Sequence, residues 1–314
     1  MKYFIITIDV EGDNLWDYRL DDDITTKNAK YLPRFQKLCE KYEYKPVYLV
    51  NFEMANDAFF TDFARKTVRT SNCEIGLHLH AWNTPPHYKL AKSCDNYGLP
   101  YLIEYPETIM REKFNFLFKQ LTETFDIKIM SHRAGRWAMD QRYFDLLIDS
   151  GIKIDCSVTP HISWKKSKGF TAGSTGSDYN RCSEDPFVVK RSLEGDFLLE
   201  TPVTIRILHN FFFTSPRTVL SDLKRFICGK PVWLRPNGNN LREMLALIEY
   251  IKKSNDDYLM FMLHSSEFMP GGSPNFKTEE SIERLYADIR IIFENIHKNF
   301  QGITLKNYYE VRSS

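Results

Sequence analysis

The sequence at residues 74–82 reads EIGLHLHAW, an apolar run that ends in two histidines and a tryptophan. This stretch has the character of a buried β-strand. Successive side chains of a strand point to opposite faces, so His78 and His80, two residues apart, face the same side. A pair of core histidines is the alternative interpretation of this segment taken alone. If the segment is a strand, both imidazoles can reach a single metal ion.

A second apolar run ends in carboxylates near the N-terminus. Residues 7–13 read TIDVEGD, which places Asp9 and Glu11 at the same two-residue spacing. Two histidines and one carboxylate with an open coordination position are the usual ligands of a hydrolytic zinc site. We therefore predict that Glu11, together with the two histidines of the first stretch, binds Zn²⁺ or another divalent transition metal. Alternatively, these carboxylates cap the first helix or pair with Arg133.

Strands and helices alternate along the rest of the chain. We expect strands at residues 3–9, 46–50, 73–80, 127–132, 152–155, 197–200 and 258–263. We expect helices near residues 27–42, 56–69, 110–125, 140–150, 216–228, 239–253 and 278–297. Repeated β–α units predict a parallel sheet, and about seven strands in 314 residues favour an α/β fold of the distorted (β/α)7 barrel type. We predict a single domain over residues 1–314, with an irregular insertion near 157–195.

Polar residues gather where these strands end. In a barrel, the active site lies at the C-terminal ends of the strands. The residues at or just after such ends are Asp9, Glu11, His78, His80, Arg133, Asp155, Glu200 and His264. A chance scatter would not favour one end of the strands, so this coincidence predicts one shared site.

Composition excludes several classes of protein. A formal net charge of +1 argues against a nucleic-acid-binding surface. The six cysteines lie far apart, with no C-x-x-C pair, which argues against a structural zinc knuckle.

No apolar run has the length of a membrane span, and the chain opens directly on a strand, so we expect a cytoplasmic protein. Aromatic residues make up 14% of the chain, a content that suits an enzyme binding sugar rings. No pattern in the sequence indicates an oligomeric state.

Four segments, in order, resemble the motifs of the polysaccharide deacetylase family, the NodB-homology carbohydrate esterases. The usual T-F-D-D-G is matched by residues 7–12, TIDVEG, and the E-I-G before the metal-binding histidines by residues 74–78, EIGLH. R-x-P-[FYW] is approximated by residues 133–137, RAGRW, and L-x-x-H by the strand that ends at residues 263–267, LHSSE. The resemblance extends from residue 3 to about 310.

The chain also departs from the family pattern. The position four residues after His78 is Trp82 rather than histidine, so His80 is the near substitute. The carboxylate at Glu11 lies one residue later, and is one methylene longer, than the usual Asp. The fourth motif of the D-S-W type is not evident, although Glu200 occupies a comparable region.

The resemblance implies hydrolysis of an acetamide on an amino sugar. In that scheme Asp9 is the general base, Arg133 orients it, and His264 is the general acid. Trp82, Trp137 and Tyr88 follow the strands on loops and are candidates to pack on a sugar face.

The function we predict is a metal-dependent hydrolase that removes an N-acetyl group from an amino sugar of a cell-surface glycan or its precursor. Two alternatives stay open. One is a glycan-binding pseudoenzyme on the same fold, which the altered second motif favours. The other is an amidase that acts on a non-sugar, cyclic amide. Fold by itself does not distinguish these functions.

Overall fold

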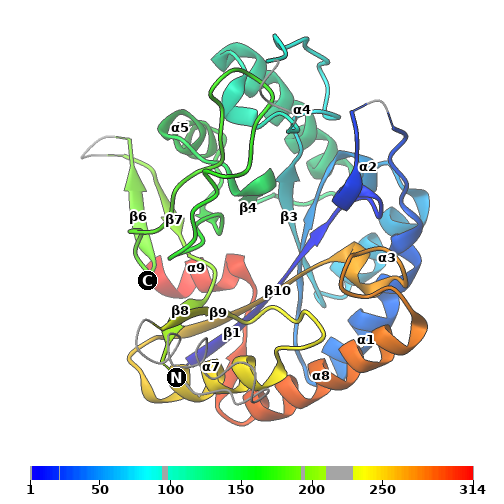
Figure 1. Ribbon diagram of the computed structural model, residues 1–314, viewed down its shortest axis with the longest axis vertical. Helices are drawn as coiled ribbons and strands as arrows, with labels where there is room; N and C mark the ends of the chain where they lie inside the picture. Colours follow the sequence, from blue (N-terminus) through cyan, green and yellow to red (C-terminus); the bar gives the residue numbers. More distant parts are fainter. Residues whose placement is uncertain (1, 21, 94–97, 192–194, 210–228, 314) are drawn as a thin grey trace, which may run out of the picture.

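The structure is a computed structural model that describes residues 2–20, 22–93, 98–191, 195–209 and 229–313. Its centre is a curled sheet with most of the helices on the outer side (Figure 1). Seven strands of this sheet are parallel, in the order β10-β1-β2-β3-β4-β5-β7. They span Tyr258–His264, Lys2–Val10, Val47–Val50, Glu74–Leu79, Ser131–Ala134, Ile154–Asp155 and Phe197–Glu200. The predicted distorted barrel of seven parallel strands is therefore confirmed.

The helices lie between strands along the chain, except α9, which follows the last strand. They are α1 (Leu32–Lys41), α2 (Phe52–Ala55), α3 (Ala58–Arg69), α4 (Glu107–Phe125), α5 (Gln141–Asp149), α7 (Leu241–Lys253), α8 (Glu279–His297) and α9 (Leu305–Ser313). All but α2 and α9 agree with helices expected from the sequence. The helix expected at 216–228 lies outside the described residues.

Side-chain alternation along the strands creates two cores. In β1, Ile6 and Ile8 pack outward against the helices, whereas Ile5 packs inside the curled sheet. The inner core includes Met260 of β10, and Tyr308 of α9 packs into it. Because Thr7 and Asp9 share the parity of Ile5, the same alternation turns them to the inside.

No strand closes the sheet between β7 and β10 in the described part of the chain. Irregular segments cover the free edge of β10 instead. The Met260 N–H donates to Thr204 Oγ1 at 2.8 Å, and the Met262 N–H donates to the Leu234 carbonyl at 3.3 Å. These bonds satisfy edge groups that would otherwise be unpaired inside the molecule.

Four strands were not expected from the sequence. Strand β6 (Phe187–Lys190) pairs antiparallel with β7, so the predicted irregular insertion at 157–195 is wrong over its last part. Strands β8 (Ile205–Leu208) and β9 (Lys230–Trp233) form a separate antiparallel pair. Strand β11 (Phe300–Gly302) pairs with the first residues of β1. These strands are short, and β9 contains Pro231, a residue that argues against a strand in sequence.

Candidate metal centre

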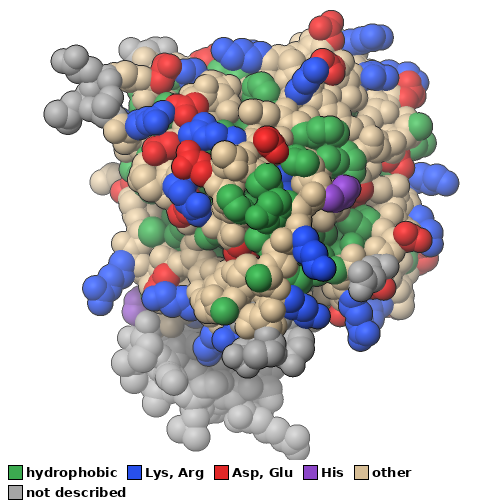
Figure 2. Space-filling view, turned by 90° about the horizontal axis from the view of Figure 1, so that it is seen from above, with side chains coloured by type: hydrophobic (Ala, Val, Ile, Leu, Met, Phe, Trp, Pro, Cys, Tyr) green, Lys and Arg blue, Asp and Glu red, His purple; other side chains and the backbone are tan. Residues whose placement is uncertain are grey.

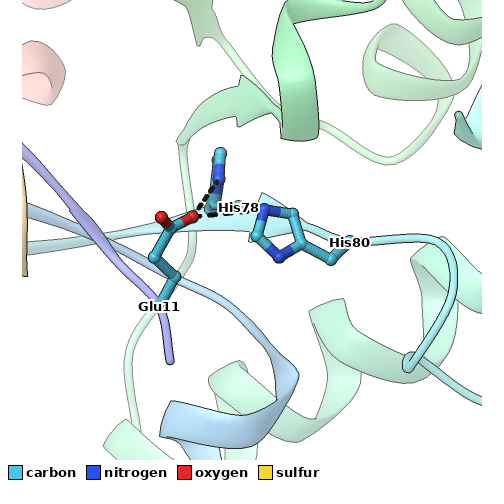
Figure 3. A group of neighbouring side chains, drawn as sticks. All are labelled: Glu11, His78 and His80. Atoms are coloured by element: carbon cyan, nitrogen blue, oxygen red, sulfur yellow. Dashed lines mark ion pairs between the residues drawn. The ribbon is translucent and has the colours of Figure 1, made fainter. Parts of the chain in front are cut away.

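Three side chains with metal-ligating atoms meet inside the mouth of the sheet (Figure 3). Glu11 Oε2 lies 3.6 Å from His78 Nε2 and 3.3 Å from His80 Nε2. One ligand atom from each residue lies within 4.8 Å of the others, and all three residues are buried. Two imidazole nitrogens and one carboxylate oxygen at this separation fit a divalent transition metal, because such an ion accepts this donor set.

The backbone fixes Glu11 just beyond the end of β1. The Glu11 N–H donates to Ser265 Oγ at 3.1 Å, and the Glu11 carbonyl accepts from the Asn28 amide at 2.7 Å. The Ser265 hydroxyl also donates to that carbonyl at 3.0 Å. The carboxylate is thus held on a rigid support, as a preorganised ligand requires.

The two histidines are oriented by different contacts. His78 Nδ1 lies 2.9 Å from the Arg133 carbonyl, which can only accept a hydrogen bond. Nδ1 therefore carries the proton and Nε2 presents its lone pair toward Glu11, the arrangement usual for a metal-bound histidine. The His80 ring stacks on Trp82, with centroids 4.3 Å apart and planes at 21°. Its Nδ1 is 3.4 Å from the Asn51 amide nitrogen, a donor, so stacking rather than a carbonyl fixes this ring.

Charges around the cluster favour a cation there. Burial raises the pKa of Glu11, but His264, His78 and His80 outweigh burial and hold that pKa well below its usual value. Burial lowers the pKa of His78, yet the charges of Asp9 and Glu11 outweigh it and raise that pKa. The same carboxylates that stabilise a proton on His78 would stabilise a divalent ion.

Asp9 lies beside the cluster and is bound by Arg133. Arg133 Nη1 donates to Asp9 Oδ1 at 2.6 Å, and Nη2 donates to Thr7 Oγ1 at 2.9 Å. Both charged side chains are buried. Burial raises the pKa of Asp9, but the charge of Arg133 outweighs it, and the pKa lies below its usual value. Asp9 is therefore a carboxylate in the folded protein.

His264 lies between the carboxylates and a polar pair that sequence reasoning did not identify. Its Nε2 is 3.7 Å from Asp9 Oδ2 and 3.8 Å from Glu11 Oε1. Its Nδ1 is 3.0 Å from Glu267 Oε2 and 3.1 Å from Arg235 Nη2. Burial raises the pKa of Glu267, but the charge of Arg235 and the bonds to His264 hold it below its usual value. The spacing of three residues from His264 to Glu267 was the available sequence signal.

A cavity of about 440 Å³ opens over these residues. Five aromatic side chains line it, and they are Trp16, Trp82, Tyr101, Trp137 and Trp164. Arg136 and Arg235 line it as well. The structure thus brings Trp82 and Trp137 to the cavity, together with three aromatic residues that follow no motif.

Tyr88 lies outside this cavity, contrary to the role expected for it. It lines a neighbouring hollow of about 370 Å³, which shares Trp82 with the main cavity. Figure 2 views the molecule from above Figure 1, the side that carries α4 and α5, and shows hydrophobic side chains gathered there among Lys and Arg. Tyr88 is 45% exposed.

His132, Asp155 and Glu200 form a separate buried group. His132 is opposite in parity to Arg133 and bonds Asp155 at 2.7 Å and the Tyr143 hydroxyl at 2.8 Å. Burial and the charge of Asp155 raise the pKa of Glu200 well above its usual value. None of these three residues lines the cavity.

Comparisons with known proteins agree with the fold. No protein-family model and no curated protein sequence matches the chain. A solved structure of a Mycobacterium smegmatis protein, described as a polysaccharide deacetylase, is 13% identical, with a TM-score of 0.54 over 99% of this chain and 91% of that one. The chain has the distorted (β/α)7 barrel fold of NodB-like polysaccharide deacetylases.

Two glucan-processing enzymes have a similar fold. A GH57 branching enzyme from Thermococcus kodakaraensis is 10% identical, with a TM-score of 0.53 over 100% of this chain and 72% of that one. A 4-alpha-glucanotransferase from Thermococcus litoralis is 11% identical, with a TM-score of 0.51 over 99% of this chain and 38% of that one. Identities this low show the fold alone, so the chemistry must be argued from the site.

Proposed function

We propose that this protein is a metal-dependent hydrolase that removes an N-acetyl group from an amino sugar. One observation carries the proposal. The candidate metal ligands Glu11, His78 and His80 share a cavity with a carboxylate, Asp9, and a histidine, His264, whose Nε2 lies 3.7 Å from that carboxylate. A Lewis acid, a base and an acid are the three groups that amide hydrolysis needs.

A divalent transition metal held by Glu11, His78 and His80 would supply the Lewis acid, which polarises an amide carbonyl and lowers the pKa of a water molecule. Asp9 is ionised and faces the same space, so it accepts the proton of the attacking water. Arg133 keeps Asp9 charged and fixes its direction through the 2.6 Å bond. His264 Nε2 gives a proton to the amine as the C–N bond breaks, which leaves acetate and a free amine.

The site argues against glycosidase chemistry of the kind that acts on glucans. Such enzymes use two carboxyl groups on either side of the bond that breaks, one of them protonated. Here the two carboxylates of the cavity, Asp9 and Glu11, lie at one end of β1, and both have pKa values below their usual range. Neither is placed to serve as a protonated acid near neutral pH.

The aromatic lining favours a sugar over a small cyclic amide as the substrate. Trp16 is 38% exposed, and it meets His264 edge-on with ring centroids 5.1 Å apart. Aromatic faces beside a reacting centre give a hexose ring apolar contact area. A cavity of about 440 Å³ falls in the range of small-molecule sites.

The test is release of acetate from N-acetylated monosaccharides, nucleotide sugars and chito-oligosaccharides by protein loaded with zinc or cobalt. A cyclic amide, dihydrouracil, is included in the same panel. We expect acetate from at least one sugar, and loss of release after the metal is chelated. Glycan binding without release from any member would favour the pseudoenzyme, and ring opening of dihydrouracil alone would favour the amidase.

A further inference from the structure

Arg136 forms part of the cavity wall, and no described carboxylate forms an ion pair with it. It follows β4 and lies where segments 99–101 and 164–168 meet the cavity. Its guanidinium lies 4.0 Å from the centre of the Tyr101 ring. It donates to two backbone carbonyls, Leu99 and Lys168, the second at 2.9 Å.

No carboxylate among the described residues forms an ion pair with Arg136, although the charge of Glu104 acts on it from a greater distance and opposes the lowering of its pKa by burial. Arginine stays protonated in proteins, and burying a charge without a counter-charge is unfavourable. The other arginine on the cavity, Arg235, differs because Glu267 Oε2 lies 3.3 Å from its Nη2. Arg133 likewise has Asp9. Among the arginines around the described site, Arg136 alone donates only to neutral acceptors.

The backbone at Arg136 is also unusual. Arg136 has a φ of 54° and Trp137 a φ of 62°, so two consecutive non-glycine residues are left-handed. Such conformations are unfavourable for residues with a Cβ, and they cluster at sites that bind ligands. This conformation places both side chains on the cavity. If Arg136 only connected two loops through its hydrogen bonds to their carbonyls, its guanidinium would not need to line the cavity.

We propose that the substrate carries an anionic group, a carboxylate or a phosphate, which Arg136 binds beside Tyr101. This inference rests on the proposed function, because it names the class of sugar that the same cavity accepts. The guanidinium would pair with the anion through its unused N–H donors, a geometry that suits both carboxylate and phosphate. The neutral amide to be cleaved would lie toward Asp9 and His264.

The experiment measures binding by tryptophan fluorescence, since four of the five tryptophans line the cavity. The probes are N-acetylglucosamine, N-acetylglucosamine 1-phosphate and N-acetylglucosaminuronic acid. We expect the wild type to bind at least one anionic probe about tenfold more tightly than the neutral sugar, a preference that falls at high salt. The two anionic probes distinguish phosphate from carboxylate.

Three variants test the assignment to Arg136. Arg136→Gln should reduce the ratio of the two affinities to about one, whereas Arg136→Lys should keep part of it. The matched control is Arg65→Gln, because Arg65 also donates to a backbone carbonyl, that of Thr124, but lies on the surface away from the cavity. If a bound metal ion caused the preference for anionic probes, that preference would persist in Arg136→Gln, because the metal ligands are intact in this variant.

Two results would overturn the inference. One is equal affinity of the wild type for the neutral and both anionic probes. The other is an anion preference that survives Arg136→Gln in a variant whose thermal melt matches the wild type. If Arg136→Gln does not fold, two measurements still test the inference. They are the ratio of the affinities for anionic and neutral probes in Arg136→Lys, and the salt dependence of that ratio in the wild type. Acetate release without anion preference would refute this inference alone, and anion preference without release would refute the proposed hydrolysis alone.

Discussion

Arg133 and Asp9, 124 residues apart in sequence, form a buried ion pair of 2.6 Å across the inside of the curled sheet. Arg133 stands opposite His78 in the β3–β4 pair, and Asp9 stands opposite His264 in the β1–β10 pair. The ion pair thus connects the two sides of the candidate site. A carboxylate fixed in this way costs little reorganisation when a reaction begins.

Removal of one partner of this ion pair should destabilise the protein strongly. Arg133→Met leaves Asp9 buried and unpaired, so we expect a loss of about 3–5 kcal/mol in the free energy of unfolding, measured with urea. The double variant Arg133→Met/Asp9→Leu removes both charges and should be less destabilised than Arg133→Met. If the double variant loses as much as the sum of the two single variants, the two charges do not interact as the structure indicates.

Asp9→Asn should separate catalysis from metal binding. Asn keeps the size of the side chain but cannot accept the proton, so we expect kcat for acetate release to fall by about 10²–10⁴. Metal content, measured by elemental analysis, should stay near that of the wild type. Full activity in Asp9→Asn would show that another group is the base.

Metal content should depend on three residues together. Glu11→Gln removes the charge of one ligand, and His78→Ala and His80→Ala each remove one imidazole. We expect each variant to lose most of the zinc bound after dialysis against a defined zinc concentration. His161→Ala is the matched control, because His161 also pairs with a glutamate, Glu184, but not in the cavity. Zinc retained at the wild-type level in both histidine variants would rule out this centre.

Glu200 should make stability fall as pH rises. Burial and Asp155 raise its pKa in the folded protein, and its Oε2 has no donor among the described residues, so it holds a proton there. The stability from that proton is complete below the unfolded pKa of about 4.3 and is lost as pH rises toward the folded pKa.

Glu200→Gln mimics the protonated side chain at every pH. Relative to the wild type, its free energy of unfolding should increase between pH 5 and 7, by up to about 1.4 kcal/mol per pH unit. Glu112→Gln, on the exposed face of α4, should show no such trend. A constant difference between Glu200→Gln and the wild type over this range would mean that Glu200 is ionised when folded.

Trp82 and Tyr88 should differ in their effect on substrate binding. Trp82 lines the cavity and stacks on His80, so we expect Trp82→Ala to raise KM about tenfold. Tyr88 lines only the neighbouring hollow, and Tyr88→Ala should change KM for a monosaccharide less than about twofold. Metal content is measured in both variants, because the loss of stacking on His80 can also weaken the metal site. Equal effects of the two substitutions would place Tyr88 at the substrate.

No helix in the described part of the chain is long and apolar enough to cross a membrane. The cytoplasmic location expected from the sequence stays a prediction, as does the absence of a nucleic-acid partner. Both can be tested by fractionation and by a filter-binding assay.

The sequence by itself determined the parts of the site that depend on strand geometry. Alternation along a strand is enough to place Asp9 and Thr7 on one face of their strand, and His78 and His80 on one face of theirs. It also turns His132 to the face opposite that of its neighbour Arg133. The β–α alternation likewise predicted the seven parallel strands and most of the helices. These features are local, so short stretches of chain encode them.

Only the tertiary structure decided which strand ends meet and what surrounds them. The register of β1 against β10 places Asp9 opposite His264, 255 residues later in the chain. The partners Glu267 and Arg235, and the cavity position of Arg136, depend on irregular segments packed over the strand ends. Such segments have no periodic pattern, because their backbone groups bond to whatever lies nearby rather than to a regular ladder. For the same reason, the sequence did not predict β6, β9 and β11, because their extended conformation depends on pairing with a neighbouring strand.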